Sequence, residues 1–293
     1  MNNTHPELRR DVNGKMVTRH VSNGVKVQNG RVASIGVPPI EKEEDPFLAV
    51  LGRTPLKEMD SALLGAAIQH KFTSQRVQDA IALASFLHRN ATRGSRGPQP
   101  REAYINHPLR NTVRLIRLGL NDEDIAIANI FHDVIEDASP ELIEIYQPSR
   151  AQELSTKQEQ MDFATFEIIK PVYGERVSNI VYAVSNPELP KGIERSESWK
   201  LYRKHVLDEI SSSEDGVVLT KASDLQDNAG SLHHHFNERR DMVLNMAQKY
   251  QPLFQPVIQR LEKVKSLSEN GIKLLVIQMQ ETEKRLIEFK SLN

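Results

Sequence analysis

The sequence contains no cysteine, which excludes disulfides and thiolate metal sites. No stretch approaches the ~20 apolar residues of a membrane span, and the first residues, MNNTHPELRRD, lack the apolar core of a secretory signal. A net charge of −1 gives no general attraction to nucleic acid or to an anionic membrane. These absences favour a cytoplasmic protein without a nucleic-acid or membrane partner. Any metal site must use histidine nitrogen and carboxylate oxygen.

The N-terminal part differs from the rest of the chain. With 39% hydrophobic and 26% charged residues, the composition is that of a soluble globular protein. Residues 14–37 hold short β-branched runs separated by two Asn-Gly pairs, which are strong hairpin signals and predict a small β-meander. A proline-rich linker, VPPIEKEEDP, follows. From about residue 58 onward the pattern is helical, and the β signal is confined to the N-terminus.

We therefore predict a mainly α fold: a helical bundle with a small N-terminal β-meander and a C-terminal helical extension. The expected parts are an N-terminal extension over 1–57, a helical domain over 58–250 and the helical extension over 251–293. The expected helices cover residues 74–91, 107–120, 121–138, 140–147, 157–172, 174–184, 197–210 and 217–232, followed by one or two C-terminal helices broken near Asn270-Gly271. Residues 91–103 are expected to form a basic, Gly/Pro-rich loop.

One predicted helix, over residues 121–138 and capped by Asn121, carries an unusual polar face. His132 and Asp133 are adjacent, and Glu136 and Asp137 follow one turn later. At about 100° per residue these four positions cover an arc of roughly 140°. Closely packed carboxylates repel one another, and burying them is costly unless a cation compensates. The simplest compensation is a bound metal ion.

Two distant residues are candidates for completing this metal site. In the predicted helix 217–232, Lys221, Asp224, Asn228 and Ser231 share one face, which makes Asp224 a candidate ligand. His107 stands at a helix start next to a proline. Two histidines and two aspartates leave positions open on a six-coordinate ion, as catalysis requires. Glu136 and Asp137 are then placed to orient a water molecule and accept its proton.

The pattern H…HD…D, with ED three residues after the HD pair, resembles that of the HD metal-dependent phosphohydrolases. Within them, AYINHPLRNTVRLIRLGLNDEDIAIANIFHDVIEDA and VVLTKASDLQDNAGSL are similar to blocks of the RelA/SpoT hydrolase domain and of the small alarmone hydrolases. SNPELPKGIERSESWK resembles the stretch before the second block in the small stand-alone members. The resemblance runs from about residue 74 to 235 and implies an HD-type helical fold.

The resemblance also implies roles for individual residues. It implies hydrolysis of the 3′-pyrophosphate of guanosine tetra- or pentaphosphate, with Glu136 and Asp137 activating the water. It implies that Arg93 packs on the guanine base and that Asn228 and Ser231 contact the ribose and 5′ phosphate. Lys221, on the same helix face, is a further candidate for substrate binding. The implied ligands of a Mn²⁺ ion, or of another divalent metal, are His107, His132, Asp133 and Asp224.

The chain departs from the family pattern in two places. The loop between His88 and His107 is four residues longer than usual, so Arg96 is an alternative to Arg93. The family's Asp-Arg-Leu-His-Asn is replaced by the run from Asp224 to Asn228, DLQDN, and Gly230 replaces a family arginine. These changes affect the expected substrate more than the expected metal. The alternatives are an adenine-based alarmone, a 3′-phosphorylated dinucleotide, a nucleotide monophosphate, or a non-enzymatic regulatory partner.

Three further patterns have plainer interpretations. The triplet His233–His235 is expected to be a solvated helix end, because successive helical residues point about 100° apart. A stripe at residues 257, 261, 264 and 267 is expected to pack against the domain, with a homodimer seam as the alternative. A basic run is expected to be a solvated face, with neutralisation of pyrophosphate as the alternative; it comprises Lys191, Arg195, Lys200 and Arg203.

Overall fold

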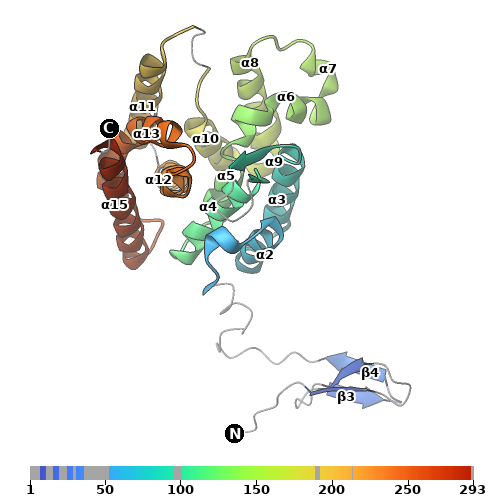
Figure 1. Ribbon diagram of the computed structural model, residues 1–293. Coiled ribbons are helices and arrows are strands. Elements are labelled where there is room, and N and C mark those ends of the chain that lie inside the picture. The colour runs from blue at the N-terminus through green and yellow to red at the C-terminus, as the bar shows by residue number, and fades with distance from the viewer. Residues whose placement is uncertain are drawn as a thin grey trace. The chain divides into compact units, whose positions relative to one another are not determined.

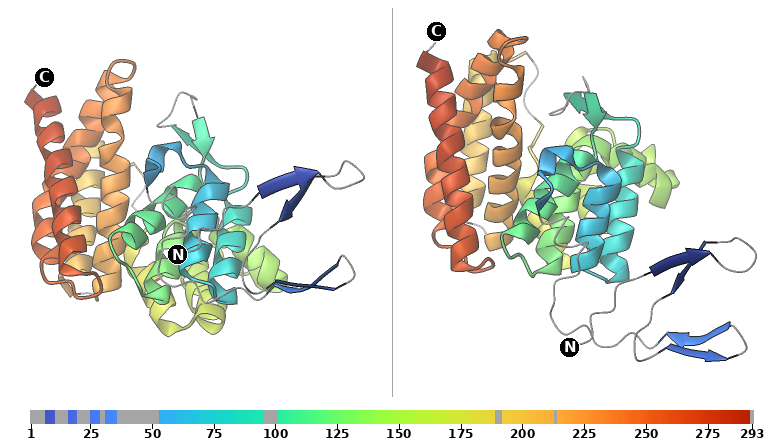
Figure 2. Two further views of the ribbon diagram at one scale, coloured as in Figure 1. Left: turned by 90° about the horizontal axis from the view of Figure 1, so that it is seen from below. Right: turned by 60° about the horizontal axis from the view of Figure 1, so that its bottom comes forward.

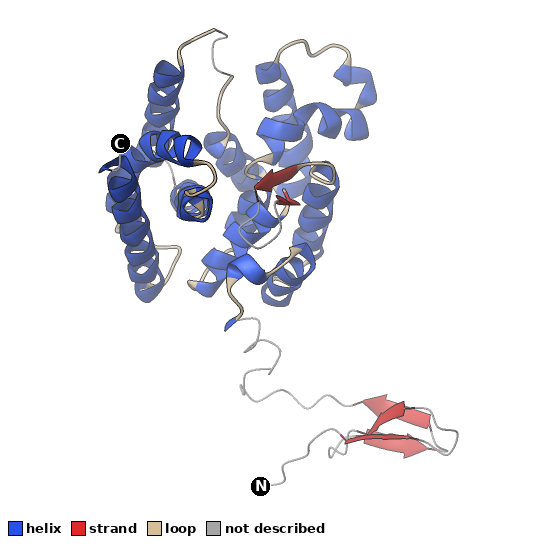
Figure 3. Cartoon of the chain, in the orientation of Figure 1, coloured by secondary structure: helices blue, strands red, loops and turns tan. Residues whose placement is uncertain are grey.

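The computed structural model of the chain describes residues 7–10, 16–19, 25–28, 31–35, 53–94, 101–188, 192–212 and 214–291. The chain divides into two compact units, Met1–Ala49 and Val50–Asn293. The described residues of the first unit are β-strands, whereas those of the second are mostly helical (Figure 3). The predicted mainly α fold is therefore confirmed. The alternative Arg96, the basic residue Lys191 and the linker lie outside the described residues.

The N-terminal unit holds two separate hairpins instead of one meander. Strands β1 (Glu7–Arg10) and β2 (Met16–Arg19) pair antiparallel, and so do β3 (Val25–Gln28) and β4 (Arg31–Ile35). Gln28 lies opposite Arg31, as the predicted Asn-Gly turn requires. β1 lies outside the predicted range because ELRR has only one apolar residue and therefore no period-2 pattern.

The described part of the helical unit consists of helices of varied length and one small β-hairpin. Figures 1 and 2 show its C-terminal helices standing together beside the rest of the unit. In chain order its elements are η1 (Leu56–Glu58), α2 (Ser61–Lys71), α3 (Gln75–Leu87), β5 (Thr92–Gly94), β6 (Arg101–Ala103), α4 (Asn106–Arg117), α5 (Glu123–Phe131), α6 (Val134–Tyr146), α7 (Pro148–Ala151), α8 (Lys157–Phe163), η2 (Ala164–Ile169), α9 (Lys170–Tyr173), α10 (Glu175–Val184), α11 (Arg195–Ser212), α12 (Asp215–Gly230), η3 (Leu232–His235), α13 (Arg240–Tyr250), η4 (Gln251–Leu253), α14 (Phe254–Leu261) and α15 (Glu269–Ser291).

Helix α5 is the central element of this unit. All of its residues from Ile125 to Phe131 are buried, and it packs on α3, α4, α10 and α12. Helix α12 contacts α4, α5 and α10, which precede it in the chain, and also α14 and α15, which follow it. It therefore joins the C-terminal helices to the rest of the unit (Figure 1). The predicted site residues come from α4, α12 and the junction of α5 with α6, which these contacts bring together.

The predicted helix over 121–138 is interrupted. α5 ends and α6 begins on either side of His132 and Asp133, which form the turn between them. The expected cap at Asn121 is also wrong by one residue. Asp122 is the N-cap, because its carboxylate accepts a hydrogen bond from a backbone amide of the first turn.

The expectation that strands occur only near the N-terminus is wrong as well. Strands β5 and β6 pair antiparallel inside the predicted loop 91–103, with Arg93 opposite Glu102. Side-chain hydrogen bonds support the pair: Arg101 donates to the hydroxyl and carbonyl oxygens of Thr92. Such polar support leaves no alternating apolar pattern by which a sequence reveals a strand.

The C-terminal stripe lies inside the unit. Its four side chains are all buried against other helices, so they are not left open as a homodimer seam; they are Val257, Leu261, Val264 and Leu267. Among the described residues no helix combines the length and the apolar character needed to cross a bilayer.

The predicted break near Asn270-Gly271 lies elsewhere. α14 ends at Leu261 and α15 begins at Glu269, so Gly271 is in the first turn of α15. A methyl group on Gly271 would overlap the carbonyl oxygen of Leu118, which follows α4. Glycine is therefore needed here for the close approach of two helices and not for a turn.

We predict that Gly271→Ala lowers the free energy of unfolding by about 1–3 kcal/mol, because the new methyl group forces the two segments apart. Gly65→Ala is the matched control. Its methyl group would meet only a side-chain carbon of Ile81 at 3.8 Å. The higher helix propensity of alanine should therefore raise the free energy of unfolding by about 0.5–1 kcal/mol. Urea unfolding of both variants tests this, and equal stability of the two would contradict the packing described.

Candidate metal centre

His132 and Asp133 owe their positions to the turn between α5 and α6. The His132 ring nitrogen Nδ1 lies 2.8 Å from the Asn129 carbonyl oxygen, which is the acceptor that the Asp133 amide uses in a continuous helix. Asp133 has φ −99° and ψ −12°, and its side chain does not cap α6. The Asp133 carboxylate instead accepts a hydrogen bond of 2.9 Å from the hydroxyl of Tyr104.

The structure brings the four predicted ligands together. His107 Nε2 lies 3.3 Å from His132 Nε2 and 2.9 Å from Asp224 Oδ1. Asp133 Oδ2 lies 3.2 Å from His132 Nε2 and 3.6 Å from His107 Nε2. Adjacent ligand atoms around a divalent ion stand about 3 Å apart when the bonds are about 2.1 Å long. His107, His132 and Asp133 are thus spaced as a metal-holding group, and Asp224 reaches the same two imidazoles.

The donor chemistry of the two histidines fits a cation. The Nδ1 atom of His107 lies 2.7 Å from a carboxylate oxygen of Asp227, and that of His132 contacts the Asn129 carbonyl. Both partners are acceptors, so both protons are assigned to Nδ1. The two Nε2 atoms then face each other at 3.3 Å in a buried place, an arrangement that requires a positive charge there, either a proton on one ring or a metal ion.

Without a metal ion, a proton on His132 supplies this positive charge. Burial disfavours the charged form of His132, but the Asp133 and Asp224 carboxylates outweigh that effect and raise the pKa of His132 well above its usual value. Burial likewise opposes ionisation of Asp133, but the charge and hydrogen bond of His132 hold the pKa of Asp133 well below its usual range. A divalent ion must therefore displace a proton to enter the centre.

Glu136 and Asp137 occupy the first turn of α6, next to this cluster. Glu136 is fixed by Asn186, whose backbone amide and side-chain amide donate to Glu136 Oε2 at 3.1 and 2.8 Å. Burial raises the pKa of Asp137 to about 6, and the charges of Asp133 and Glu136 add to the effect. An acid with such a pKa exchanges protons readily near neutral pH.

A cavity of about 320 Å³ adjoins Glu136 of the acidic pair. It contains aromatic faces, two ammonium groups and hydrogen-bonding side chains, the mixture expected for a polar aromatic ligand. Lys249 lies above the ring of Tyr202, 4.2 Å from the ring centre. The cavity is lined by Glu136, Lys157, Asn186, Pro187, Glu188, Ser198, Trp199, Tyr202 and Lys249.

Two relatives of the chain are named as the same kind of enzyme. No family model matches the chain. A guanosine-3′,5′-bis(diphosphate) 3′-pyrophosphohydrolase of Aquifex aeolicus is 28% identical over 214 residues, which cover 73% of this chain and 25% of that protein. The Drosophila melanogaster enzyme of the same name, MESH1, is 24% identical over 184 residues, covering 61% of this chain and 84% of that protein.

The resemblance to HD-type alarmone hydrolases is confirmed. The chain spans about a quarter of the length of the Aquifex relative. A solved structure described as a metazoan ortholog of SpoT that hydrolyzes ppGpp covers 72% of this chain and 96% of its own, with a TM-score of 0.47 and 21% identity.

The residues expected at the nucleotide form a connected set beside the metal centre. Arg93 donates to the side-chain oxygen of Asn228 at 2.8 Å, and Asn228 donates to Asp224 at 2.7 Å. The Arg93 guanidinium also lies 5.8 Å from the centre of the Tyr104 ring. The hairpin β5–β6 thus holds Arg93 next to a predicted ligand, as its expected contact with substrate requires.

Two other expected substrate residues contact the backbone. Ser231 donates to the carbonyl oxygen of Asn228 at 3.1 Å and is nearly buried. The Lys221 ammonium donates to the carbonyl oxygen of Val184 at the end of α10. Burial lowers the pKa of Lys221, although Asp224 opposes this. A role of Lys221 and Ser231 in binding substrate stays a prediction.

The plainer interpretations of the other polar patterns fit the structure. His233 and His234 are exposed on the short helix η3, outside the group of side chains spaced for a metal. Lys200 is exposed and pairs with Glu197 at 3.0 Å on the same helix. Arg195 is exposed as well. Arg203 is only partly exposed and donates to a backbone carbonyl of α13.

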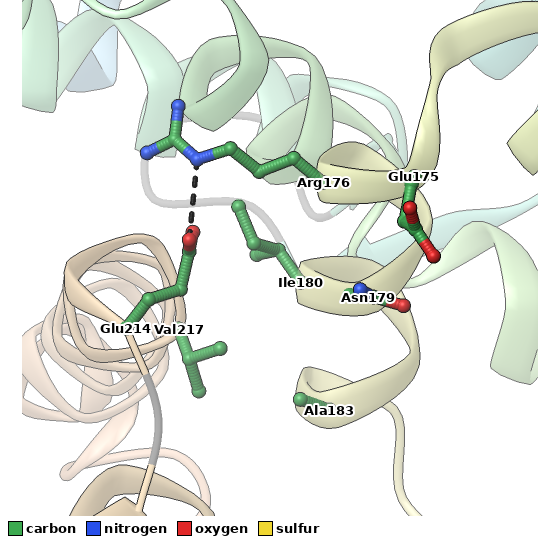
Figure 4. A pocket seen from close by; sticks show the side chains of 7 residues that line it. All are labelled: Glu175, Arg176, Asn179, Ile180, Ala183, Glu214 and Val217. Atoms are coloured by element: carbon green, nitrogen blue, oxygen red, sulfur yellow. Dashed lines mark hydrogen bonds and ion pairs between the residues drawn. The ribbon is translucent and has the colours of Figure 1, made fainter.

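A second cavity, of about 500 Å³, lies between α10 and the start of α12 (Figure 4). The ion pair between Arg176 and Glu214, at 3.1 Å, crosses it. Its lining includes none of the predicted ligands, so it is separate from the metal centre.

Several residues at the centre were not predicted. Trp199 and Lys249 line the cavity, but Lys249 lies beyond the range of the resemblance and no spacing marks it. Asp227 contacts His107, although it appeared in the sequence only as a departure from the family pattern. Tyr104 lies in the quoted block that begins AYINHP, and its contact with Asp133 is visible only in three dimensions.

We predict that the protein binds Mn²⁺ and releases protons as it does so, because the ion displaces the proton that His132 holds. Affinity therefore rises with pH. Asp133→Asn should weaken binding by more than about 100-fold, since even altered outer partners of a ligand cost about 10- to 100-fold. Calorimetric titration in buffers of different ionisation enthalpy measures both effects.

The control for this titration is Asp208→Asn, which changes an exposed carboxylate paired with Lys204 on α11. It should bind Mn²⁺ like the unchanged protein. Equal affinity of the Asp133 and Asp208 variants would refute the assignment of the centre.

Proposed function

We propose that the chain is a metal-dependent hydrolase that removes the 3′-pyrophosphate of guanosine tetra- or pentaphosphate, with Mn²⁺ as its ion. The observation that carries the proposal is the convergence of His107, His132, Asp133 and Asp224 beside an acidic pair and a cavity. The activity named for the Aquifex and Drosophila relatives supplies the substrate class.

The chain's own residues suit activation of water. When bound, the ion supplies Lewis acidity toward a phosphoryl oxygen and makes nearby water more acidic. Asp137, whose pKa is raised, accepts the proton of the attacking water. Glu136, immobilised by Asn186, orients that water. The water oxygen bonds to the phosphorus next to the ribose 3′ oxygen, which leaves with a proton as pyrophosphate is released.

The cavity suits a phosphorylated nucleotide. Lys157 and Lys249 supply positive charge for phosphate, and Trp199 offers an aromatic face for stacking. Following the resemblance, Arg93 contacts the guanine base, Asn228 and Ser231 contact the ribose and 5′ phosphate, and Lys221 supports the substrate side of α12. Fixing the substrate against the acidic pair contributes acceleration through proximity.

Incubation of the full chain with Mn²⁺ and guanosine tetraphosphate should release pyrophosphate and leave guanosine diphosphate. Asp137→Asn should lower kcat by about 10²- to 10⁴-fold, the usual contribution of general-base catalysis, without loss of folded protein. Chromatography of the nucleotide and an enzymatic pyrophosphate assay identify the products. If an adenine alarmone is turned over faster, or if another nucleotide releases orthophosphate, then that nucleotide and not guanosine tetraphosphate is the substrate.

Lys249→Gln should raise KM by about 10- to 100-fold and change kcat less, because a charge-assisted contact to phosphate contributes about 1.5–3 kcal/mol. Lys273→Gln is the control, since this exposed lysine on α15 pairs with Glu269. Steady-state kinetics separates KM from kcat. If the two variants have the same KM, the cavity is not the nucleotide site.

A further inference from the structure

Asp227 is a fully buried carboxylate that no predicted role explains. Its side chain has no exposed surface. Its Oδ2 atom lies 2.7 Å from His107 Nδ1. Its Oδ1 atom accepts from Arg110 Nε at 3.1 Å and from Arg114 Nη2 at 2.7 Å. An aspartate in such a place is stable only because every one of these groups donates to it.

The donors to Asp227 lie on one face of α4. His107, Arg110 and Arg114 follow one another at spacings of 3 and 4 residues, which places them on the side that packs against α12. All three are buried. The same face of α4 therefore carries His107 and holds Asp227 in position.

On the Asp227 side of the His107 ring, the positive and negative side chains balance without a positive charge on His107. Arg110 also donates to Glu102 with two hydrogen bonds, at 2.7 and 3.2 Å. The two arginines therefore match the two carboxylates of Asp227 and Glu102. The His107 ring donates its Nδ1 proton to Asp227, while its Nε2 atom faces Asp224 Oδ1 at 2.9 Å and His132 Nε2 at 3.3 Å.

This arrangement differs from the family pattern that the chain resembles. The family pattern Asp-Arg-Leu-His-Asn has histidine where this sequence has Asp227. An imidazole has at most one acceptor nitrogen and cannot accept from two arginines and a histidine together. The contact between Asp227 and His107 therefore does not follow from the family motif.

We propose that Asp227 is the positioning residue of the metal centre: it fixes the His107 ring and its tautomer, so that Nε2 is presented to the ion. This inference rests on the metal site of the proposed function. Carboxylates that accept from the second nitrogen of a metal-binding histidine typically improve metal affinity about 10- to 100-fold.

Asp227→Asn should weaken Mn²⁺ binding by about 10- to 100-fold in calorimetry performed well below the unfolding temperature. The amide keeps one acceptor oxygen and adds a donor, so it no longer satisfies both His107 and the arginines. At saturating Mn²⁺ the lost kcat should be largely recovered, whereas loss of a ligand itself would not be compensated in this way.

Glu102→Gln is the matched control. Glu102 belongs to the same buried ion network but contacts Arg110 instead of His107. Its change should destabilise the fold and leave Mn²⁺ affinity within about twofold, whereas a merely structural role of Asp227 predicts equal losses of affinity in both variants. If Asp227→Asn folds poorly, Asp227→Asn with Arg114→Met, which removes one competing donor, provides the same comparison.

Nitrogen-15 NMR of the metal-free protein tests the positioning directly. His107 Nδ1 should carry a proton in the unchanged protein and in Glu102→Gln, and should lose it in a fraction of the molecules in Asp227→Asn. An unchanged tautomer in Asp227→Asn overturns the inference. Failure of the unchanged protein to bind Mn²⁺ would instead refute the proposed function, and the NMR result would still decide how Asp227 acts.

Discussion

The structure depends on how two buried imidazoles are held. The Nδ1 atoms of His107 and His132 face acceptors, and their Nε2 atoms lie 3.3 Å apart. Carboxylates of Asp133 and Asp224 lie against the same two atoms. Every group in this small volume offers electrons, and only a positive charge makes the arrangement stable. The fold thus positions donors that suit a bound cation.

The helices are arranged around this requirement. A continuous helix through His132 and Asp133 would have spread these side chains over a wide arc, whereas the turn between α5 and α6 directs both toward α4 and α12. The same turn places Glu136 and Asp137 in the first turn of α6, next to the centre. On the opposite side, the ion network of Asp227 locks α4 to α12. One junction thus sets the positions of two predicted ligands, His132 and Asp133, and of the acidic pair.

Much of this could be predicted from the sequence, and the reasons for the failures are physical. Helical periodicity identified α3, α4, α10, α11 and α12, and the unusual group of acids around His132 identified the centre. The break after α5 was missed because a side-chain hydrogen bond to the Asn129 carbonyl, not a glycine or proline, accompanies it. The sequence at Gly271 predicts a helix break because the real reason for this glycine, its close approach to Leu118, depends on tertiary packing.

Residues that act across long sequence distances were equally hidden. Lys249 reaches the cavity from α13, and Asp227 is 120 residues from His107. No local pattern encodes such contacts. Both relatives are named for guanosine-3′,5′-bis(diphosphate), whereas the DLQDN run and the longer loop distinguish this chain from the pattern that it resembles.

The most direct test of the central claim is anomalous diffraction from crystals of the full chain soaked with Mn²⁺. The account predicts one strong manganese peak at about 2.0–2.2 Å from Nε2 of both His107 and His132 and from carboxylate oxygens of Asp133 and Asp224. A site with no manganese, in which a lysine or arginine side chain stands between the two imidazoles, would contradict it.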